Sequence, residues 1–117
     1  MSAPRPAVNA RARALERSAP LFAALGDETR LRVLARLSTG EPQSIVRLTM
    51  GSDVTRQAIT KHLQVLATAG LVGSVRRGRE RVWELEPRRI EEARRALQQI
   101  SETWDEALGR LKAFVER

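Results

Sequence analysis

Two short segments of the chain concentrate side chains that could bind a polyanion. The start of a predicted helix at 55–69 turns cationic, amide and hydroxyl groups outward, and residues 76–81 hold four arginines around one glycine. Arginine and glutamine form paired hydrogen bonds with guanine and adenine, and clustered cations bind phosphate oxygens. The residue types therefore predict contacts with double-stranded DNA through Arg56, Gln57, Thr60 and Lys61 and through Arg76, Arg77, Arg79 and Arg81.

Each segment also has a simpler interpretation. The polar residues of the helix would be ordinary solvated positions, and the arginines would keep the edges of a hairpin from pairing with other sheets. The overall charge favours DNA: the chain of 117 residues has a formal net charge of +7. A strongly basic small domain is typical of proteins that bind nucleic acid.

The composition excludes several other classes of protein. There is no cysteine and only one histidine, His62. Disulfides, a thiol nucleophile and a sulfur-ligated metal site are thus excluded, and no catalytic triad or glycine-rich phosphate loop is found. We expect no enzymatic activity and no cofactor. No uncharged stretch is long enough for a membrane span and no secretory signal is visible, so a cytoplasmic protein is expected.

The order of local signals divides the chain into three parts. Residues 1–17 are predicted to be a basic tail, disordered or partly helical; a mitochondrial transit peptide over Met1–Ala14 is the alternative. Residues 18–86 are predicted to form helices begun by four residues that favour helix N-termini, followed by a hairpin with Gly78 near its tip. Those residues are Ser18, with Pro20 in the first turn, and Asp27, Ser44 and Thr55.

Two of these helices suggest how the polar residues are positioned. A short helix at Ser44–Met50, a turn with glycine and a longer helix at Thr55–Ala69 form a predicted helix-turn-helix. Ile59, Leu63 and Leu66 would pack inward and leave the opposite face for the major groove. With the basic hairpin as a wing, the fold expected is mainly α with a small β-hairpin, a winged helix-turn-helix.

Residues 87–117 are predicted to form one long helix that begins at Pro87 and makes a dimer. Apolar residues recur at alternating spacings of three and four from Ile90 to Phe114, the pattern of a heptad seam. A helix of roughly 40 Å is longer than a compact domain of this size. Its free apolar face is expected to pair with the first helix and with a second subunit. The predicted interface residues are Leu21, Leu97, Ile100, Trp104, Leu108, Leu111 and Phe114.

Three motifs in order give the chain a family resemblance. They are LGDETRLRVL at Leu25–Leu34, TRQAITKHL at Thr55–Leu63 and LATAGLV at Leu66–Val72. The segment from Leu21 to Pro87 resembles the winged helix-turn-helix of the ArsR/SmtB repressors. WDEALGRLK at Trp104–Lys112 further resembles a branch whose genes often lie beside those of START-like (SRPBCC) proteins.

The resemblance implies a homodimeric transcriptional regulator, most simply a repressor, that binds an inverted-repeat operator. By position in the motifs, the expected DNA contacts are Thr55, Arg56, Gln57, Thr60, Lys61 and His62, with Arg77 and Arg79 from the wing and Arg81 beside them. His62 has two interpretations, a partly buried side chain with an internal partner or a neighbour of the phosphate backbone; the second is favoured.

The chain departs from the family where metals bind. Metal-sensing members have cysteines in the segment that is Ser44–Met50 here, and others use histidines and acids of the terminal helices. Glu102, Asp105 and Glu106 have no histidine beside them, and zinc and copper favour nitrogen or sulfur ligands. We therefore expect no metal site. The alternative function is a protein-interaction adaptor that uses the same scaffold without specific DNA binding.

Overall fold

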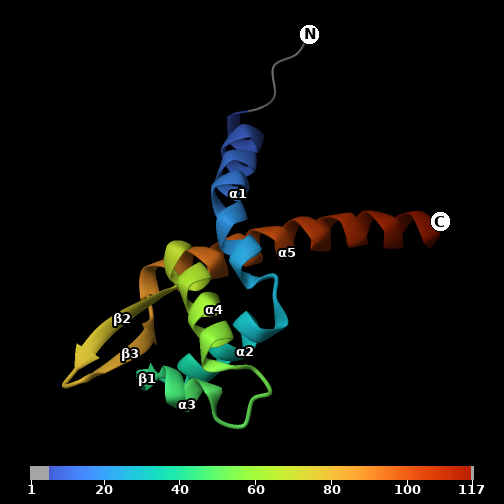
Figure 1. Cartoon of the computed structure of the whole chain (residues 1–117). Coiled ribbons are helices and arrows are strands. Elements are labelled where there is room, and N and C mark those ends of the chain that lie inside the picture. Colours follow the sequence, from blue (N-terminus) through green and yellow to red (C-terminus); the bar gives the residue numbers. More distant parts are fainter. Residues whose placement is uncertain (1–5, 117) are drawn as a thin grey trace.

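The computed structural model describes residues 6–116, with side chains from residue 10 onward. Within that range five helices and three strands follow one another (Figure 1). They are α1 Pro6–Leu25, α2 Glu28–Leu37, β1 Gln43–Ser44, α3 Ile45–Thr49, α4 Arg56–Thr68, β2 Val72–Arg77, β3 Glu80–Leu85 and α5 Pro87–Val115. This is the mainly helical winged helix-turn-helix that the sequence predicts. The part of the expected tail at 1–5 lies outside the described residues.

Side-chain caps begin three of the helices. Asp27, Ser44 and Thr55 precede α2, α3 and α4, and each side-chain oxygen accepts a hydrogen bond from the backbone N–H three residues later, at 3.0–3.2 Å. Each bond satisfies one of the N–H groups that a helix leaves free at its start. The N-terminus of α5 has Pro87 in its first turn instead. These four predicted helix starts are confirmed.

The predicted start of the first helix is wrong. α1 runs without a break from Pro6 to Leu25, so Ser18 lies in its interior and its hydroxyl donates to the carbonyl of Ala14 at 3.0 Å. Pro20 is also interior, where it leaves one backbone carbonyl without its N–H donor. Serine and proline are typical of helix starts, but the helix-forming residues before them extend α1 backwards over most of the expected tail.

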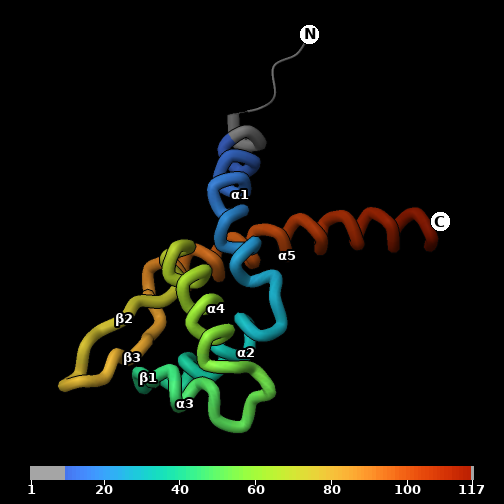
Figure 2. Tube along the Cα trace, in the orientation of Figure 1, coloured from blue at the N-terminus to red at the C-terminus, as the bar shows by residue number. Residues whose placement is uncertain are grey.

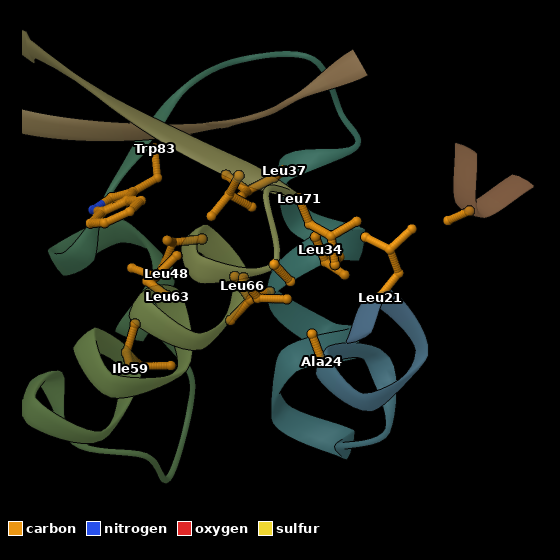
Figure 3. Packing of buried hydrophobic residues seen from close by; sticks show 14 residues of the cluster. Leu21, Ala24, Leu34, Leu37, Leu48, Ile59, Leu63, Leu66, Leu71 and Trp83 are labelled. Carbon is orange, nitrogen blue, oxygen red and sulfur yellow. The ribbon is translucent and has the colours of Figure 1, made fainter. Parts of the chain in front are cut away.

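The core lies between the inner face of α4 and the apolar faces of the helices and strands around it. Ile59, Leu63 and Leu66 of α4 are buried against residues of α2, α3 and the sheet (Figure 3). Leu21 of α1 closes one end of this cluster and Trp83 of β3 the other. Since α4 packs on its neighbours through this whole face, its opposite face is held in a fixed direction.

The sheet has one strand more than the sequence predicts. β3 pairs with β2 on one side and with the two-residue β1 on the other, both antiparallel. Arg77 pairs with Glu80, so the hairpin turns over the two residues Gly78 and Arg79. Gly78 has φ +62°, a conformation that glycine adopts freely. The hairpin points away from α1 and α5 (Figure 1).

α5 leaves the rest of the domain after its first turns. Its 29 residues correspond to about 43 Å, and its second half extends into open space in Figure 2. The radius of gyration is 18.8 Å, against about 13 Å for a compact domain of this length. Only Ala93 and Ala96 of α5 are buried, while its N-terminal half contacts α1. Among residues 6–116, the distal half of α5 therefore has no packing partner.

Substitution of Gly70, which lies between α4 and the wing, tests the backbone conformation at that position. Its φ is +80°, and a Cβ there would lie 2.9 Å from Arg89 Nε. We expect Gly70→Ala to lower the free energy of unfolding by about 1–2 kcal/mol, measured by urea denaturation at fixed protein concentration. Gly109→Ala is the matched control: it lies inside α5 with open space around it, so alanine should raise stability by about 0.5–1 kcal/mol. Two equal effects would contradict the left-handed conformation at Gly70.

Candidate nucleic-acid interface

The exposed face of α4 carries the side chains that sequence analysis assigns to DNA. Arg56, Gln57 and Lys61 are exposed, while Ile59 and Leu63 on the other side are buried in the core. α3 contacts α4 and forms the first helix of the helix-turn-helix. The structure thus brings the predicted polar residues together on one outward surface near the N-terminus of α4.

Two threonines at this surface differ in whether the hydroxyl proton is free to form a further hydrogen bond. Thr55 Oγ1 accepts from the Ala58 backbone N–H, so its hydroxyl proton remains free to bind a phosphate oxygen. Thr60 Oγ1 donates to the Arg56 carbonyl at 2.8 Å. Thr60 can therefore accept a hydrogen bond or present its methyl group to a thymine, but its proton is already used.

His62 lies at the side of α4, half-buried between two charged residues from the start of α2. Arg30 Nη1 lies 3.3 Å from His62 Nδ1, and Asp27 Oδ2 lies 3.7 Å from the same nitrogen. The Asp27 carboxylate also accepts the Arg30 backbone N–H, and this bond, with smaller contributions from the positive charges near it, lowers the pKa of Asp27. His62 therefore has an internal partner, as one of the two interpretations expects.

The strand register places two of the wing arginines directly opposite each other. Arg76 lies directly opposite Arg81, and Arg77 lies opposite Glu80. Since paired residues share a face and alternate residues repeat it, Arg76 and Arg81 are on the same face as Trp83, whose ring packs into the core. Two like charges opposite each other destabilise a hairpin. A phosphate oxygen between them would remove that repulsion.

The residue type of Arg76 predicts a DNA contact, but the set implied by the family resemblance does not include it, and no sequence pattern predicts the contacts of Arg30. A two-residue turn at Gly78-Arg79 would have placed Arg76 opposite Arg81, so the register was the missing signal. No local pattern connects Arg30 with His62, because 32 residues separate them and only the packing of α2 against α4 brings them together.

The predicted dimer residues fall into two groups. Five of them, Leu97, Trp104, Leu108, Leu111 and Phe114, keep between 52% and 70% of their surface exposed, and Ile100 is half-buried. With Ile100 they form one apolar face of α5, called here the α5 seam. Leu21 is a correction, because it is 1% exposed inside the core of its own subunit. It supports α1 from within and has no surface for a partner.

The described part of the chain holds no group of three metal-ligating side chains close enough together to bind an ion. Between residues 6 and 116, none of the helices combines the length and apolar composition needed to cross a bilayer.

The exposed face of α4, the basic hairpin and the helical core define a winged helix-turn-helix DNA-binding domain. A family model described as a helix-turn-helix domain matches residues 25–75. The HTH-type transcriptional regulator YuzN of Bacillus subtilis is 46% identical over 68 residues, which cover 53% of this chain and 74% of YuzN. The HTH-type transcriptional regulator Rv2034 of Mycobacterium tuberculosis is 41% identical over 64 residues, 55% of this chain and 59% of its own length.

A solved structure of the same kind covers almost the whole fold. The ArsR-like transcriptional regulator from Rhodococcus sp. RHA1 is 38% identical, with a TM-score of 0.67 over 85% of this chain and 92% of that one. The chain belongs to the ArsR family of winged helix-turn-helix transcriptional regulators.

Proposed function

We propose that this regulator is a repressor that binds an inverted-repeat operator as a homodimer. The observation that carries the proposal is the α5 seam, an exposed apolar face on the helix that continues directly from the DNA-binding domain. A two-fold dimer through this face gives the protein two α4 helices related by symmetry, as an inverted repeat requires. Half-sites one turn of DNA apart need a spacing of roughly 34 Å between the two helices.

The length and chemistry of the seam favour a second copy of the chain as its partner. Its leucines and aromatic rings repeat at heptad spacing, and the α5 residues opposite the seam include Glu102 and Glu106. A helix with one apolar and one charged face pairs with an identical helix by burying the apolar faces against each other. α1, which contacts α5, would flank this interface.

Each DNA-facing residue has a separate part in the proposal. Arg56 and Gln57 would contact base edges in the major groove, whereas Lys61 and the hydroxyl of Thr55 would contact phosphates. The Arg76–Arg81 pair and Arg79 would follow the backbone or enter the adjacent minor groove. The complete assigned set is Thr55, Arg56, Gln57, Thr60, Lys61, His62, Arg76, Arg77, Arg79 and Arg81.

The proposal includes a regulator that does not respond to metal at the usual family positions. Ser44, the first residue of the segment where metal sensors carry cysteines, uses its side chain to cap α3. Glu102, Asp105 and Glu106 lie exposed on α5 with only oxygen ligands to offer. We expect equilibrium dialysis to show no saturable, stoichiometric zinc binding. Such binding would overturn this part of the proposal.

Selection of bound duplexes from a random pool tests the DNA-binding proposal directly. We expect an inverted repeat, with affinity that falls steeply as salt concentration rises because phosphate contacts release counterions. A reporter gene whose promoter contains the selected operator should then be transcribed less when the protein is present. Weak binding with no sequence preference, or no binding, would favour the adaptor function instead.

Two substitutions should separate base recognition from backbone binding. Gln57→Ala is expected to relax base preference at one position of the operator, by about 1–3 kcal/mol in discrimination. Arg79→Ala is expected to weaken binding to all sequences and to lower the slope of log affinity against log salt by about 1. The measurement is a salt titration of each variant with the selected duplex and with single-base variants of it. Equal losses of specificity in both would contradict the assignment.

A further inference from the structure

One side chain of α2 joins the end of α1 to the DNA-binding helix. The Arg30 guanidinium donates to the carbonyls of Ala24 and Ala23 at the C-terminus of α1, the second at 3.4 Å. Its Nη1 lies 3.3 Å from His62 Nδ1 on α4. The carbonyls at the end of a helix lack intrahelical donors and carry its negative dipole end, so a cation is stabilised there. The carbonyls at the end of α1 thus fix the position of the Arg30 guanidinium that contacts His62.

A hydrogen bond between Arg30 Nη1 and His62 Nδ1 would fix which nitrogen of His62 carries the proton. A guanidinium has only N–H donors and stays protonated in proteins, so Nδ1 must be the acceptor. The neutral ring then carries its proton on Nε2. Nδ1 is the nitrogen with a protein partner, and among the described residues the one buried side-chain nitrogen or oxygen without a partner belongs to Trp83, not to His62. The Nε2–H group is therefore open to the surroundings of α4.

Asp27 provides the competing arrangement. Its Oδ2 lies 3.7 Å from His62 Nδ1, so a proton on Nδ1 would point to this carboxylate instead. The charged groups that the described structure places against the ring are Arg30 of α2 and Asp27, which caps α2, while α1 contributes the carbonyls that bind Arg30. Without Arg30, the attraction of Asp27 would favour the Nδ1–H tautomer and leave a lone pair on Nε2.

We propose that Arg30 is a positioning residue for DNA binding: it holds His62 in the Nε2–H tautomer, so that His62 donates a hydrogen bond to a phosphate oxygen. The inference rests on the proposed function, in which α4 faces DNA. It adds that Arg30 sets the tautomer with which His62 contacts a phosphate. A phosphate oxygen can only accept, so the wrong tautomer would place two lone pairs against each other. Arg30 itself does not need to touch DNA.

The tautomer can be observed before any DNA is added. His62 is the single histidine of the chain, so a long-range proton–nitrogen correlation spectrum of the imidazole contains one ring. We expect the wild type at neutral pH to show the Nε2–H tautomer, and Arg30→Met to shift the population toward Nδ1–H. A wild-type ring that is mainly Nδ1–H overturns the proposal.

Two substitutions of His62 distinguish the roles of its two ring nitrogens. In His62→Gln the amide nitrogen reaches the position of Nε2 and can donate to a phosphate, whereas in His62→Asn the side chain ends near Nδ1 and keeps only the Arg30 contact. Affinity is measured on a random-sequence duplex of about 30 base pairs, since a phosphate contact is independent of sequence. We expect Asn to lose about tenfold and Gln to stay near the wild type. Equal affinities of the two variants overturn the proposal.

The double variant of Arg30→Met and His62→Gln distinguishes positioning from support of the fold. Arg30→Met alone should lose about tenfold in affinity for the random-sequence duplex. The glutamine of the double variant donates to phosphate without help from Arg30, so the loss caused by Arg30→Met should disappear in that background. A loss that persists in the double variant means that Arg30 only supports the fold.

The His62 variants keep the test decisive if Arg30→Met does not fold, because both retain Arg30. A wild-type protein that binds no duplex at low salt would overturn the proposed function and this inference with it. A wild type that binds DNA while the Gln and Asn variants behave alike would overturn only the role of Arg30 and His62.

Discussion

Leu111→Glu is expected to separate the proposed dimer into folded monomers. Leu111 lies in the middle of the distal seam and is exposed in the single chain, so the substitution removes nothing from the subunit core. Two-fold symmetry places the change twice in one interface, and the lost burial of two leucines amounts to about 4 kcal/mol. This corresponds to about 1,000-fold in the dimer dissociation constant.

The consequence for DNA should be as large. A dimer engages its second half-site at a high effective concentration, which a monomer does not have. We therefore expect Leu111→Glu to weaken binding to the inverted repeat by at least about 100-fold, and to leave binding to an isolated half-site almost unchanged. Sedimentation equilibrium measures the first effect and fluorescence anisotropy of labelled duplexes the second.

The chain supplies both a control and an internal probe. Ala113→Glu places the same charge on the opposite side of α5, also exposed, and should leave the dimer intact. The two tryptophans differ in environment, since Trp83 is buried and Trp104 is 65% exposed. The emission of Trp104 should shift to shorter wavelength as the wild type associates, and should not in Leu111→Glu. A wild type that stays monomeric at micromolar concentration would contradict the dimer.

Local chemistry explains which parts of the fold the sequence predicts. Asp27, Ser44 and Thr55 act on backbone N–H groups only three residues away, so the residue type alone is enough to indicate where a helix starts. The apolar spacing of α4 likewise depends only on helix geometry. For the same reason the exposed positions of Arg56, Gln57 and Lys61 on α4 follow from the sequence.

Features that depend on distant contacts were not predictable in this way. β1 has two residues, and what makes it a strand is its pairing with Val82 and Trp83 almost forty positions along the chain. Leu21 has the spacing of an interface residue, but packing of α1 on the core decides that it is buried. The contact between Arg30 and His62 likewise follows from tertiary packing, and a local pattern contains no information about it.

The second large effect is expected in the core behind the proposed DNA-binding surface. Leu63 is completely buried on the inner face of α4, between the exposed polar residues of that helix and the rest of the domain. Leu63→Ala removes buried methyl groups and leaves a cavity that the surrounding side chains only partly fill. We expect it to lower the free energy of unfolding by about 3 kcal/mol per subunit, measured by urea denaturation at a single protein concentration, because dimer stability depends on concentration.

Val65→Ala is the matched control, since Val65 lies on the same helix and 42% of its surface is exposed. Its loss should stay below about 1 kcal/mol. The two variants also separate stability from recognition. Leu63 touches no DNA in the proposed complex, so the folded fraction of Leu63→Ala should keep the wild-type base preference. A changed preference in folded protein would mean that the core at Leu63 sets the orientation of α4 as well as its stability.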